Sequence, residues 1–223
     1  MSRETWAAVD AHLVELFVHH DAALEQALAR SADAGLPPIQ VSPTQGKLLW
    51  LLARAAGARR ILEIGTLGGY STIWLARALP ADGRLITLEI EPDRAEVARR
   101  NLASTGLDHL VEVRVGAALS TMARLVAEEV GSFDMVFVDA DKRRLPDYVA
   151  ASLELSRPGT MIVVDNVVRE GQVLDAASAD ADVVGVRRCL EVLAADPRLD
   201  ATALQTVGAK GYDGFAVALV AAS

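Results

Sequence analysis

Two aspartates and an asparagine stand where strand-like runs of this sequence end. Asp139 closes FDMVFVD (133–139), and Asp165-Asn166 closes TMIVVDN (160–166). Neighbouring parallel strands lie about 4.8 Å apart, so these carboxylates would repel each other unless a cation lay between them. Oxygen-only ligands favour hard ions such as Mg²⁺, Mn²⁺ or Ca²⁺. The pattern predicts a divalent-cation site at Asp139, Asp165 and Asn166, with capping of the following helices as the alternative.

A lysine follows the first of these aspartates by three residues. Of the 22 basic residues 19 are arginines, and Lys142 is one of only three lysines. A lysine can lose its proton near a dication, whereas an arginine does not. Lys142 is therefore a candidate base, although a solvated surface charge is the ordinary alternative.

A glycine-rich segment, LEIGTLGGYS (62–71), follows an earlier strand-like run. Such a turn lets the backbone approach a ligand closely. It is not the GxGxxG pattern of dinucleotide folds, because Leu67 replaces the second glycine. Glu89 closes the next strand-like run, where an acid can accept both hydroxyls of a ribose. The two features together predict a ribose-bearing ligand, against a ligand-free turn and a solvated glutamate.

Strand-like and helix-like segments alternate from Arg59 onward. This alternation indicates parallel strands joined by right-handed crossovers. The last two runs, separated by KGYDG, indicate a hairpin. We therefore expect an α/β fold with a Rossmann-like, doubly wound, seven-stranded sheet, mostly parallel with an antiparallel C-terminal hairpin strand, and helices on both faces. The strand-like runs are 59–64, 84–89, 110–115, 133–139, 160–165, 201–207 and 215–220, and the helix-length segments are 70–79, 92–105, 118–130, 146–156 and 182–195.

The first 38 residues precede this alternating pattern. Apolar residues at helical spacing predict one or two amphipathic helices that end at Gly35-Leu-Pro-Pro38. Ser42-Pro43 then predicts a capped helix that runs to about Ala56. We expect a single domain over 1–223, with 1–38 as an N-terminal helical arm.

The composition restricts the partners and the compartment. The chain is 52% hydrophobic, which is enough for a buried core. Its net charge of −8 disfavours a nucleic-acid binder. A single cysteine excludes an intramolecular disulfide and a paired-cysteine zinc site. The N-terminus does not resemble a signal peptide, and no apolar run approaches the ~20 residues of a membrane span. A soluble, cytoplasmic protein with no nucleic-acid or membrane partner is expected.

Four ordered motifs point to one family. EIGTLGGYS (63–71), Glu89, VDADK (138–142) and VVDNV (163–167) together resemble the cation-dependent class I S-adenosylmethionine-dependent O-methyltransferases, which include catechol and caffeoyl-CoA O-methyltransferases. The similarity runs from about Val41 to the C-terminus. It implies methyl transfer from S-adenosylmethionine to a hydroxyl of a catechol-like small molecule, with a divalent cation (Mg²⁺, Mn²⁺ or Ca²⁺) as second cofactor.

The resemblance also implies roles for particular residues. Lys142 matches the general base, and Asp139, beside it, is both catalytic and a metal ligand together with Asp165 and Asn166. Ala118 takes the adenine-facing position, where catechol-type relatives have a polar residue. The matching cofactor-binding positions are Val41, Glu63, Gly65, Thr66, Ser71, Glu89, Ala118 and Asp139.

The acceptor and the assembly are less defined. Segment 167–182 should shape the acceptor pocket, and its lack of a basic cluster favours a polyphenol or natural-product intermediate over a coenzyme A ester. A homodimer is expected, in which the N-terminal arm covers either the site or the partner.

Three other functions are disfavoured. A nicotinamide-dependent oxidoreductase would not explain the set of Asp139, Asp165 and Asn166. A nucleic-acid N-methyltransferase would be expected to have an NPPY-like motif and a less acidic chain. A non-catalytic binding protein would be expected to lose the metal and base residues. The remaining candidates are better explained by packing or by a surface position: His12, His19, His20, His109, Cys189, Trp50 and Trp74.

Overall fold

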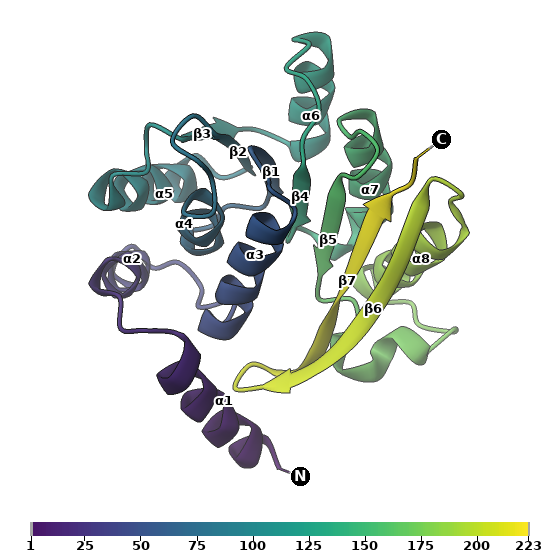
Figure 1. The fold of residues 1–223 in the computed structure, drawn as a ribbon. Helices are drawn as coiled ribbons and strands as arrows, with labels where there is room; N and C mark the ends of the chain where they lie inside the picture. The colour runs from purple at the N-terminus through teal and green to yellow at the C-terminus, as the bar shows by residue number, and fades with distance from the viewer. Residues whose placement is uncertain (1, 223) are drawn as a thin grey trace. The chain divides into compact units, whose positions relative to one another are not determined.

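A computed structural model describes residues 2–222 of the chain. Within this range seven strands form one sheet in the order β3-β2-β1-β4-β5-β7-β6 (Figure 1). The strands are β1 (Arg60–Ile64), β2 (Arg84–Glu89), β3 (Val111–Val115), β4 (Met135–Val138), β5 (Met161–Asp165), β6 (Leu199–Gly208) and β7 (Gly211–Val220).

Strand directions confirm the expected fold class. β1 pairs parallel with β2, β2 with β3, and β4 with β5. β7 runs antiparallel to both β5 and β6. The hairpin itself is longer than the sequence suggested, because KGYDG is mostly strand. Gly208 pairs directly with Gly211, whose φ of +103° is a conformation open mainly to glycine, so the turn contains only Ala209 and Lys210.

The helices begin and end largely where the sequence signals stood. Ser42 caps α3 by accepting the Gln45 N–H at 3.2 Å, and Gly106 ends α5 at a φ of +68°. The N-terminal arm contains two helices, separated by the N-cap Asp21. The α-helices are α1 (Arg3–Phe17), α2 (Ala22–Asp33), α3 (Pro43–Ala55), α4 (Tyr70–Ala76), α5 (Pro92–Thr105), α6 (Ala118–Ala127), α7 (Leu145–Glu154) and α8 (Ala181–Ala195), and two 3₁₀ segments are η1 (Lys142–Arg144) and η2 (Arg169–Leu174).

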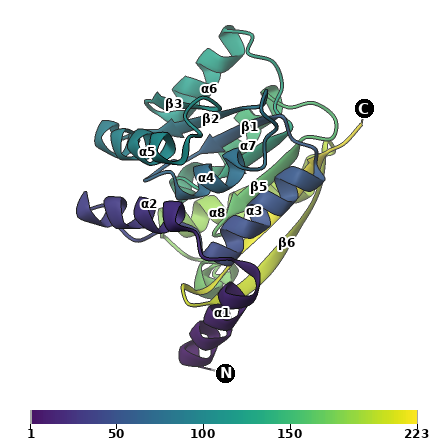
Figure 2. The same ribbon diagram turned by 60° about the vertical axis from the view of Figure 1, so that its left-hand side comes forward.

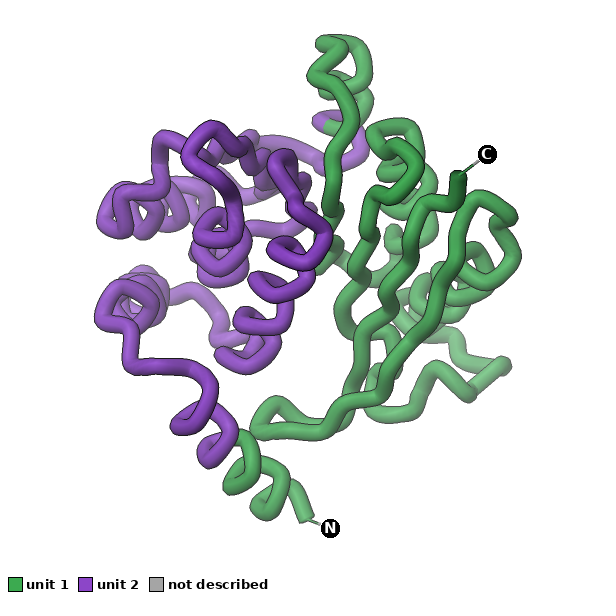
Figure 3. The backbone as a smooth tube through the Cα atoms, in the orientation of Figure 1, with its two compact units in different colours: residues 1–10, 122–223 green, residues 11–121 purple. Residues whose placement is uncertain are grey.

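The chain divides into two compact units (Figure 3). Unit 1 contains Met1–Asp10 and Met122–Ser223, and unit 2 contains Ala11–Thr121. The beginning of α1 thus belongs with the C-terminal strands. The expected single domain over 1–223 stays a prediction.

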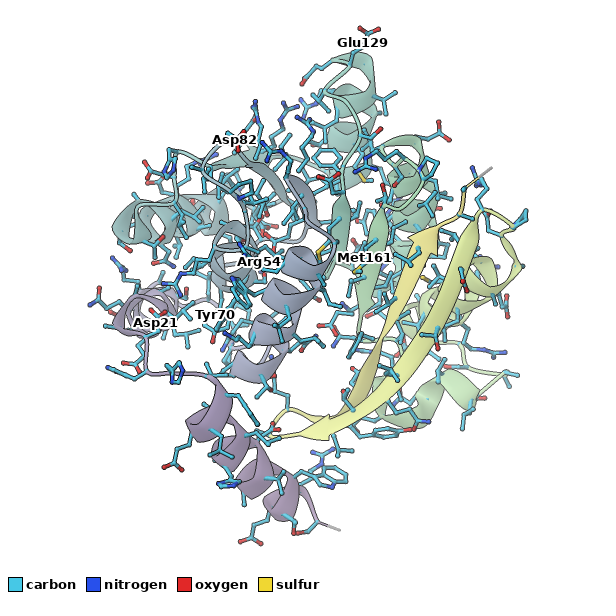
Figure 4. All side chains as sticks on the ribbon, in the orientation of Figure 1. Asp21, Arg54, Tyr70, Asp82, Glu129 and Met161 are labelled. Atoms are coloured by element: carbon cyan, nitrogen blue, oxygen red, sulfur yellow. The ribbon has the colours of Figure 1, made fainter. Side chains whose placement is uncertain are left out.

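Unit 2 places strands β1 and β2 in an apolar core. Every residue of α4 is buried, and α4 and α5 pack against β2, as Figure 2 also shows. Asp21 and Tyr70, labelled in Figure 4, mark the contact of the arm with this core. Asp21 pairs with Arg77, and the hydrogen bond from that guanidinium holds the pKa of Asp21 below its usual value. The arm is thereby tied to α4.

Unit 1 is built on β4 and β5, which are almost wholly buried. α7 packs against both strands, and α8 packs against α7 and β6. None of the helices in the described part of the chain is long and apolar enough to cross a membrane. β6 differs from the other strands, because its residues from Asp200 to Val207 are exposed.

Candidate active site

The end of β1 carries a buried carboxylate held by hydroxyl groups. Glu63 is 0% exposed and accepts hydrogen bonds from Ser71 Oγ at 2.6 Å, from Thr87 Oγ1 at 2.7 Å and from Thr72. Thr66 joins the same group through Thr87 at 2.6 Å. These donors offset the cost of burying a charge and fix the turn after β1 to β2 and α4. Three predicted cofactor residues, Glu63, Thr66 and Ser71, therefore lie together.

The glycine-rich turn is held by the end of β2. Gly65 has a φ of +101°, and its N–H donates to the Leu88 carbonyl at 3.0 Å. Glu89 is 5% exposed and accepts the N–H of Leu67 at 2.8 Å and that of Glu91 at 3.0 Å. Leu67 has a positive φ of 50°, which is unfavourable for leucine. Glu89 thus stabilises the strained turn.

Two further predicted cofactor residues occupy element boundaries in unit 2. Val41 is buried directly before α3, and Ala118 is half-buried as the first residue of α6. Gly116 precedes α6 and donates its N–H to the Glu89 carbonyl at 2.8 Å. The loop before Ala118 therefore starts at the strand end that carries Glu89.

The predicted metal ligands lie at the carboxyl ends of two paired strands in unit 1. Val138 and Val164 are register partners, so Asp139 and Asp165 follow at equivalent positions. Figure 4 labels Met161, which begins β5 at the opposite end. Asp165 is 5% exposed and accepts the Asn166 N–H at 2.9 Å.

Asn166 adopts a φ of +59°, which asparagine tolerates better than most residues. This conformation turns the chain sharply at the end of β5. Strand pairing thus brings Asp139, Asp165 and Asn166 to one end of neighbouring strands, as the sequence led us to expect, and their role as metal ligands stays a prediction.

Lys142 lies beside this group. It is 8% exposed, and its Nζ lies 2.8 Å from Asp139 Oδ1. A glycine on α8 sets the position of this lysine's backbone: a Cβ on Gly185 would lie 2.4 Å from the Lys142 carbonyl oxygen and 2.5 Å from Arg143 Cα. The turn that carries Lys142 therefore packs directly on the α8 backbone.

The donor set fits a hard divalent cation. Its side-chain donors are carboxylate and amide oxygens at the end of β5 or directly after β4 and β5, and oxygen ligands are those that Mg²⁺, Mn²⁺ and Ca²⁺ prefer. Within residues 2–222 no group of three His, Cys, Asp or Glu side chains is placed to hold a metal. The predicted set contains two carboxylates and one amide, so it is not a cluster of that type.

Sequence reasoning missed Asp213. Its Oδ1 accepts the backbone N–H groups of Val168, Arg169 and Gly214, each at 3.0 Å. The segment that it holds begins after Asn166 and contains positive φ angles at Arg169 and Glu170. Asp213 lies in the KGYDG motif, where the sequence indicated only a turn.

Two other contacts were also missed. Tyr148 on α7 donates a hydrogen bond to Asp141, next to Lys142, and burial is the main cause that raises the pKa of this tyrosine. Lys210, in the hairpin turn, interacts electrostatically with Asp139 and Asp165. Partial burial lowers the pKa of Lys210, and those two carboxylates oppose the shift. The only sequence feature that could have drawn attention to Lys210 is that the chain has three lysines against 19 arginines.

Sheet order and site geometry together define a class of protein. A sheet of order 3-2-1-4-5-7-6 with a reversed seventh strand is the class I S-adenosylmethionine-dependent methyltransferase fold. The sequence profile of the O-methyltransferase family matches residues 15–217. A catechol O-methyltransferase of Niastella koreensis is 50% identical over 220 residues, which cover 99% of this chain and 100% of that protein.

Solved structures agree with these matches. An O-methyltransferase from Bacillus cereus in complex with SAH has a TM-score of 0.97 and 53% identity over 98% of this chain and 100% of that one. The O-methyltransferase TomG from Streptomyces achromogenes in complex with SAM has a TM-score of 0.96 and 53% identity, covering 100% of both chains. The chain belongs to the O-methyltransferase family, and it is an enzyme of the S-adenosylmethionine-dependent type. The family resemblance read from the four motifs is confirmed.

Proposed function

We propose that this enzyme methylates one hydroxyl of a catechol-like small molecule and requires a divalent cation to do so. The observation that carries the proposal is the group at the ends of β4 and β5. There Lys142 Nζ lies 2.8 Å from Asp139 Oδ1, and Asp165 and Asn166 stand at the equivalent end of the paired strand. The relatives named as catechol O-methyltransferases support the same substrate class.

The chain's residues divide the work between cofactor and acceptor. Ser71, Gly65 and Thr66 hold the methionine end of S-adenosylmethionine, with Glu63 fixing the strand end, and Glu89 accepts the ribose hydroxyls. Val41 and Ala118 line the pocket, the latter against the adenine. The cofactor supplies the methyl group on its sulfonium. Buried hydroxyl and carboxylate groups suit this role, because their positions are fixed before the ligand binds.

Lys142 and the three oxygen ligands act on the acceptor. A catechol hydroxyl is mostly protonated at pH 7, since a phenol has a pKa near ~10. A divalent cation held by Asp139, Asp165 and Asn166 would lower the pKa of a hydroxyl that it binds. Lys142 Nζ then takes the hydroxyl proton, and burial of this lysine limits its motion. Asp139 positions the lysine through their 2.8 Å contact.

Chelation of a diol by the cation is the reason to expect that the enzyme prefers a catechol to a simple phenol. Two adjacent hydroxyls fix the acceptor by two bonds, whereas a single hydroxyl leaves the ring able to swing. Only one hydroxyl can face the methyl group, so the product should be a monomethyl ether. We propose a homodimer as the assembly, with the exposed face of β6 at the interface, and the cytoplasm as the compartment.

The test combines metal removal with a matched pair of variants. Turnover of catechol should disappear after dialysis against EDTA and return with Mg²⁺ or Mn²⁺. Asp165→Asn should lose at least ~10²-fold in kcat/KM. The control Asp134→Asn changes an acid near the other end of the same strand pair, paired with Arg157, and should keep its rate.

Three results would contradict the proposal. Full activity in excess chelator would show that the reaction needs no divalent cation. Equal kcat/KM for catechol, its monomethyl ether and the matching phenol would show that the acceptor is not bound by chelation. Failure to methylate any diol while S-adenosylmethionine binds would show that catechols are not the substrate class.

A further inference from the structure

The β6–β7 hairpin turn projects past the carboxyl end of β5. Phe215 pairs with Asp165, and β7 begins four residues earlier at Gly211. At about 3.3 Å per residue, this places the start of β7 about 13 Å beyond Asp165. The turn, Ala209-Lys210, therefore lies at the same end of the sheet as Asp139, Asp165 and Asn166, which are proposed to bind the acceptor.

Asp10, midway along α1, holds this turn. Asp10 Oδ2 accepts the Ala209 N–H at 2.7 Å. The packing is close, because a Cβ on Gly208 would lie 2.4 Å from the same oxygen. Both contacts lie within unit 1, and the hairpin turn lies beside α1 in Figures 1 and 2. The backbone that carries Lys210 is thus fixed from outside the hairpin.

A second contact ties α1 to the segment after Asn166. Arg3 Nη2 lies 2.6 Å from Glu170 Oε1, and the same carboxylate is 3.5 Å from where a Cβ on Gly211 would be. Glu170 is therefore an acid near the turn whose charge is paired with Arg3. The N-terminal residues therefore contact both the hairpin turn and the segment after Asn166.

Lys210 brings a second positive charge to the ends of β4 and β5. Its ammonium interacts with both Asp139 and Asp165, whereas Lys142 is in direct contact with Asp139. The other acids near the turn are engaged: Asp10 with Ala209, Glu170 with Arg3, and Asp213 with three backbone N–H groups. Once a divalent cation balances Asp139 and Asp165, those two carboxylates no longer balance the ammonium of Lys210.

We propose that Lys210 is a specificity-determining residue that favours catechols carrying a carboxylate, with Asp10 as the residue that positions it. This inference rests on the proposed function. The diol of the acceptor is directed to Asp139, Asp165 and Asn166, so ring substituents extend outward, where the turn provides the cation. A partly exposed charge pair supports roughly a five- to tenfold preference over a neutral group of the same shape.

The experiment compares two acceptors that share a diol and differ in charge: 3,4-dihydroxybenzoate and 3,4-dihydroxybenzamide. The wild-type enzyme with Mg²⁺ should favour the benzoate by roughly five- to tenfold in kcat/KM, with the difference in KM. Lys210→Gln should bring the ratio close to one, because the benzoate loses more in kcat/KM than the benzamide does. Lys210→Glu should reverse the preference.

Titration calorimetry with SAH and Mg²⁺ present supplies a readout independent of turnover. Dissociation constants for the two acceptors should show the same preference in the wild type and lose it in Lys210→Gln. Asp10→Ala should weaken the preference by loosening the turn, and Asp10→Asn, which keeps an oxygen acceptor for Ala209, should largely restore it. Lys47→Gln, which removes a lysine that lies over Trp50 on α3, is the matched control and should leave the ratio unchanged.

The outcomes separate this inference from the proposed function. An unchanged ratio in Lys210→Gln, in turnover and in binding, would overturn the role of Lys210 while catechol methylation stands. An equal loss on both acceptors would also overturn it, since Lys210 would then only balance Asp139 and Asp165. Absence of turnover on both acceptors in the wild type would overturn the proposed function, and the calorimetry would still decide whether Lys210 selects the anion.

Discussion

Lys142, the proposed base, differs from the other basic residues of its turn in its surroundings. Lys142 is almost fully buried and lies 2.8 Å from a carboxylate, whereas the other charged residues of the same turn, Arg143 and Arg144, are exposed. Burying a lysine is costly unless it is paired, so its position indicates a use other than solubility.

Replacing Lys142 by arginine should keep the charge and remove the base. We expect kcat to fall by at least ~10²-fold, because an arginine side chain does not give up its proton in water-like conditions. Steady-state rates on catechol, with calorimetric affinity for S-adenosylmethionine, check this; the affinity should be unchanged. Lys47→Arg is the control, and a wild-type rate in Lys142→Arg would show that the base is dispensable.

Removing the Asp213 carboxylate should release the segment after Asn166. Asp213→Ala leaves three backbone N–H groups without their acceptor, which should cost about 1–3 kcal/mol in unfolding free energy. The KM for the acceptor should rise more than that for S-adenosylmethionine. Urea unfolding and kinetics measure both effects. Asp213→Asn retains Oδ1 and should recover most of the loss; an alanine variant with wild-type stability and KM would refute the role.

At the scale of elements, α8 controls the turn that carries Lys142. Alanine is normally favoured over glycine in a helix interior by up to ~1 kcal/mol. At Gly185 the added Cβ would meet the backbone of Lys142 and Arg143, which cannot move away without shifting the turn.

Gly185→Ala should therefore destabilise the enzyme by about 1–3 kcal/mol and lower kcat. Urea unfolding and steady-state kinetics are the measurements. Arg188→Ala, at an exposed position of the same helix, should leave both unchanged. A stabilised Gly185→Ala variant would mean that α8 and η1 are not in close contact.

The buried thiol of α8 should make stability depend on alkaline pH. Burial raises the pKa of Cys189 to about 12, from a usual value of 9.0. The folded thiol thus stays neutral while the unfolded one ionises, so stability is lost as pH rises above 9. The wild type should lose more unfolding free energy between pH 8 and 10 than Cys189→Ala, and the native thiol should not react with a thiol reagent at pH 8. Equal pH dependence in both proteins would contradict this.

At the scale of the whole molecule, β6 presents an exposed strand face. Leu204 is 54% and Val207 is 50% exposed, and no charged residue lies between Ala201 and Gly208. An exposed strand of this length and composition invites pairing or packing with another chain.

Light scattering should therefore give a mass near twice 23.7 kDa for the wild type. The double substitution Leu204→Lys and Val207→Lys should yield monomers, because it places charges on the proposed interface. Leu174→Lys, at a residue 87% exposed on η2, is the control and should remain dimeric. A monomeric wild type at micromolar concentration would exclude the dimer.

The sequence alone determined the fold class, the family and the grouping of Asp139, Asp165 and Asn166 at one end of two strands. Alternating apolar runs define buried strands, and parallel strands bring Asp139 and Asp165 to one end without further information. Ser42-Pro43 and Gly106 correctly indicated helix ends, because capping depends on contacts among only a few neighbouring residues.

Tertiary structure alone decided the contacts that join distant segments. Asp10 meets Ala209 across 199 positions, and Asp213 meets Val168 across 45. Gly185 approaches Lys142 through helix packing that no local pattern encodes. The hairpin turn was misjudged for the same reason: pairing of Gly208 with Gly211 extends both strands, and strand pairing is a non-local interaction. Local propensity and periodicity specify elements, whereas side-chain contacts between elements exist only once the chain has packed.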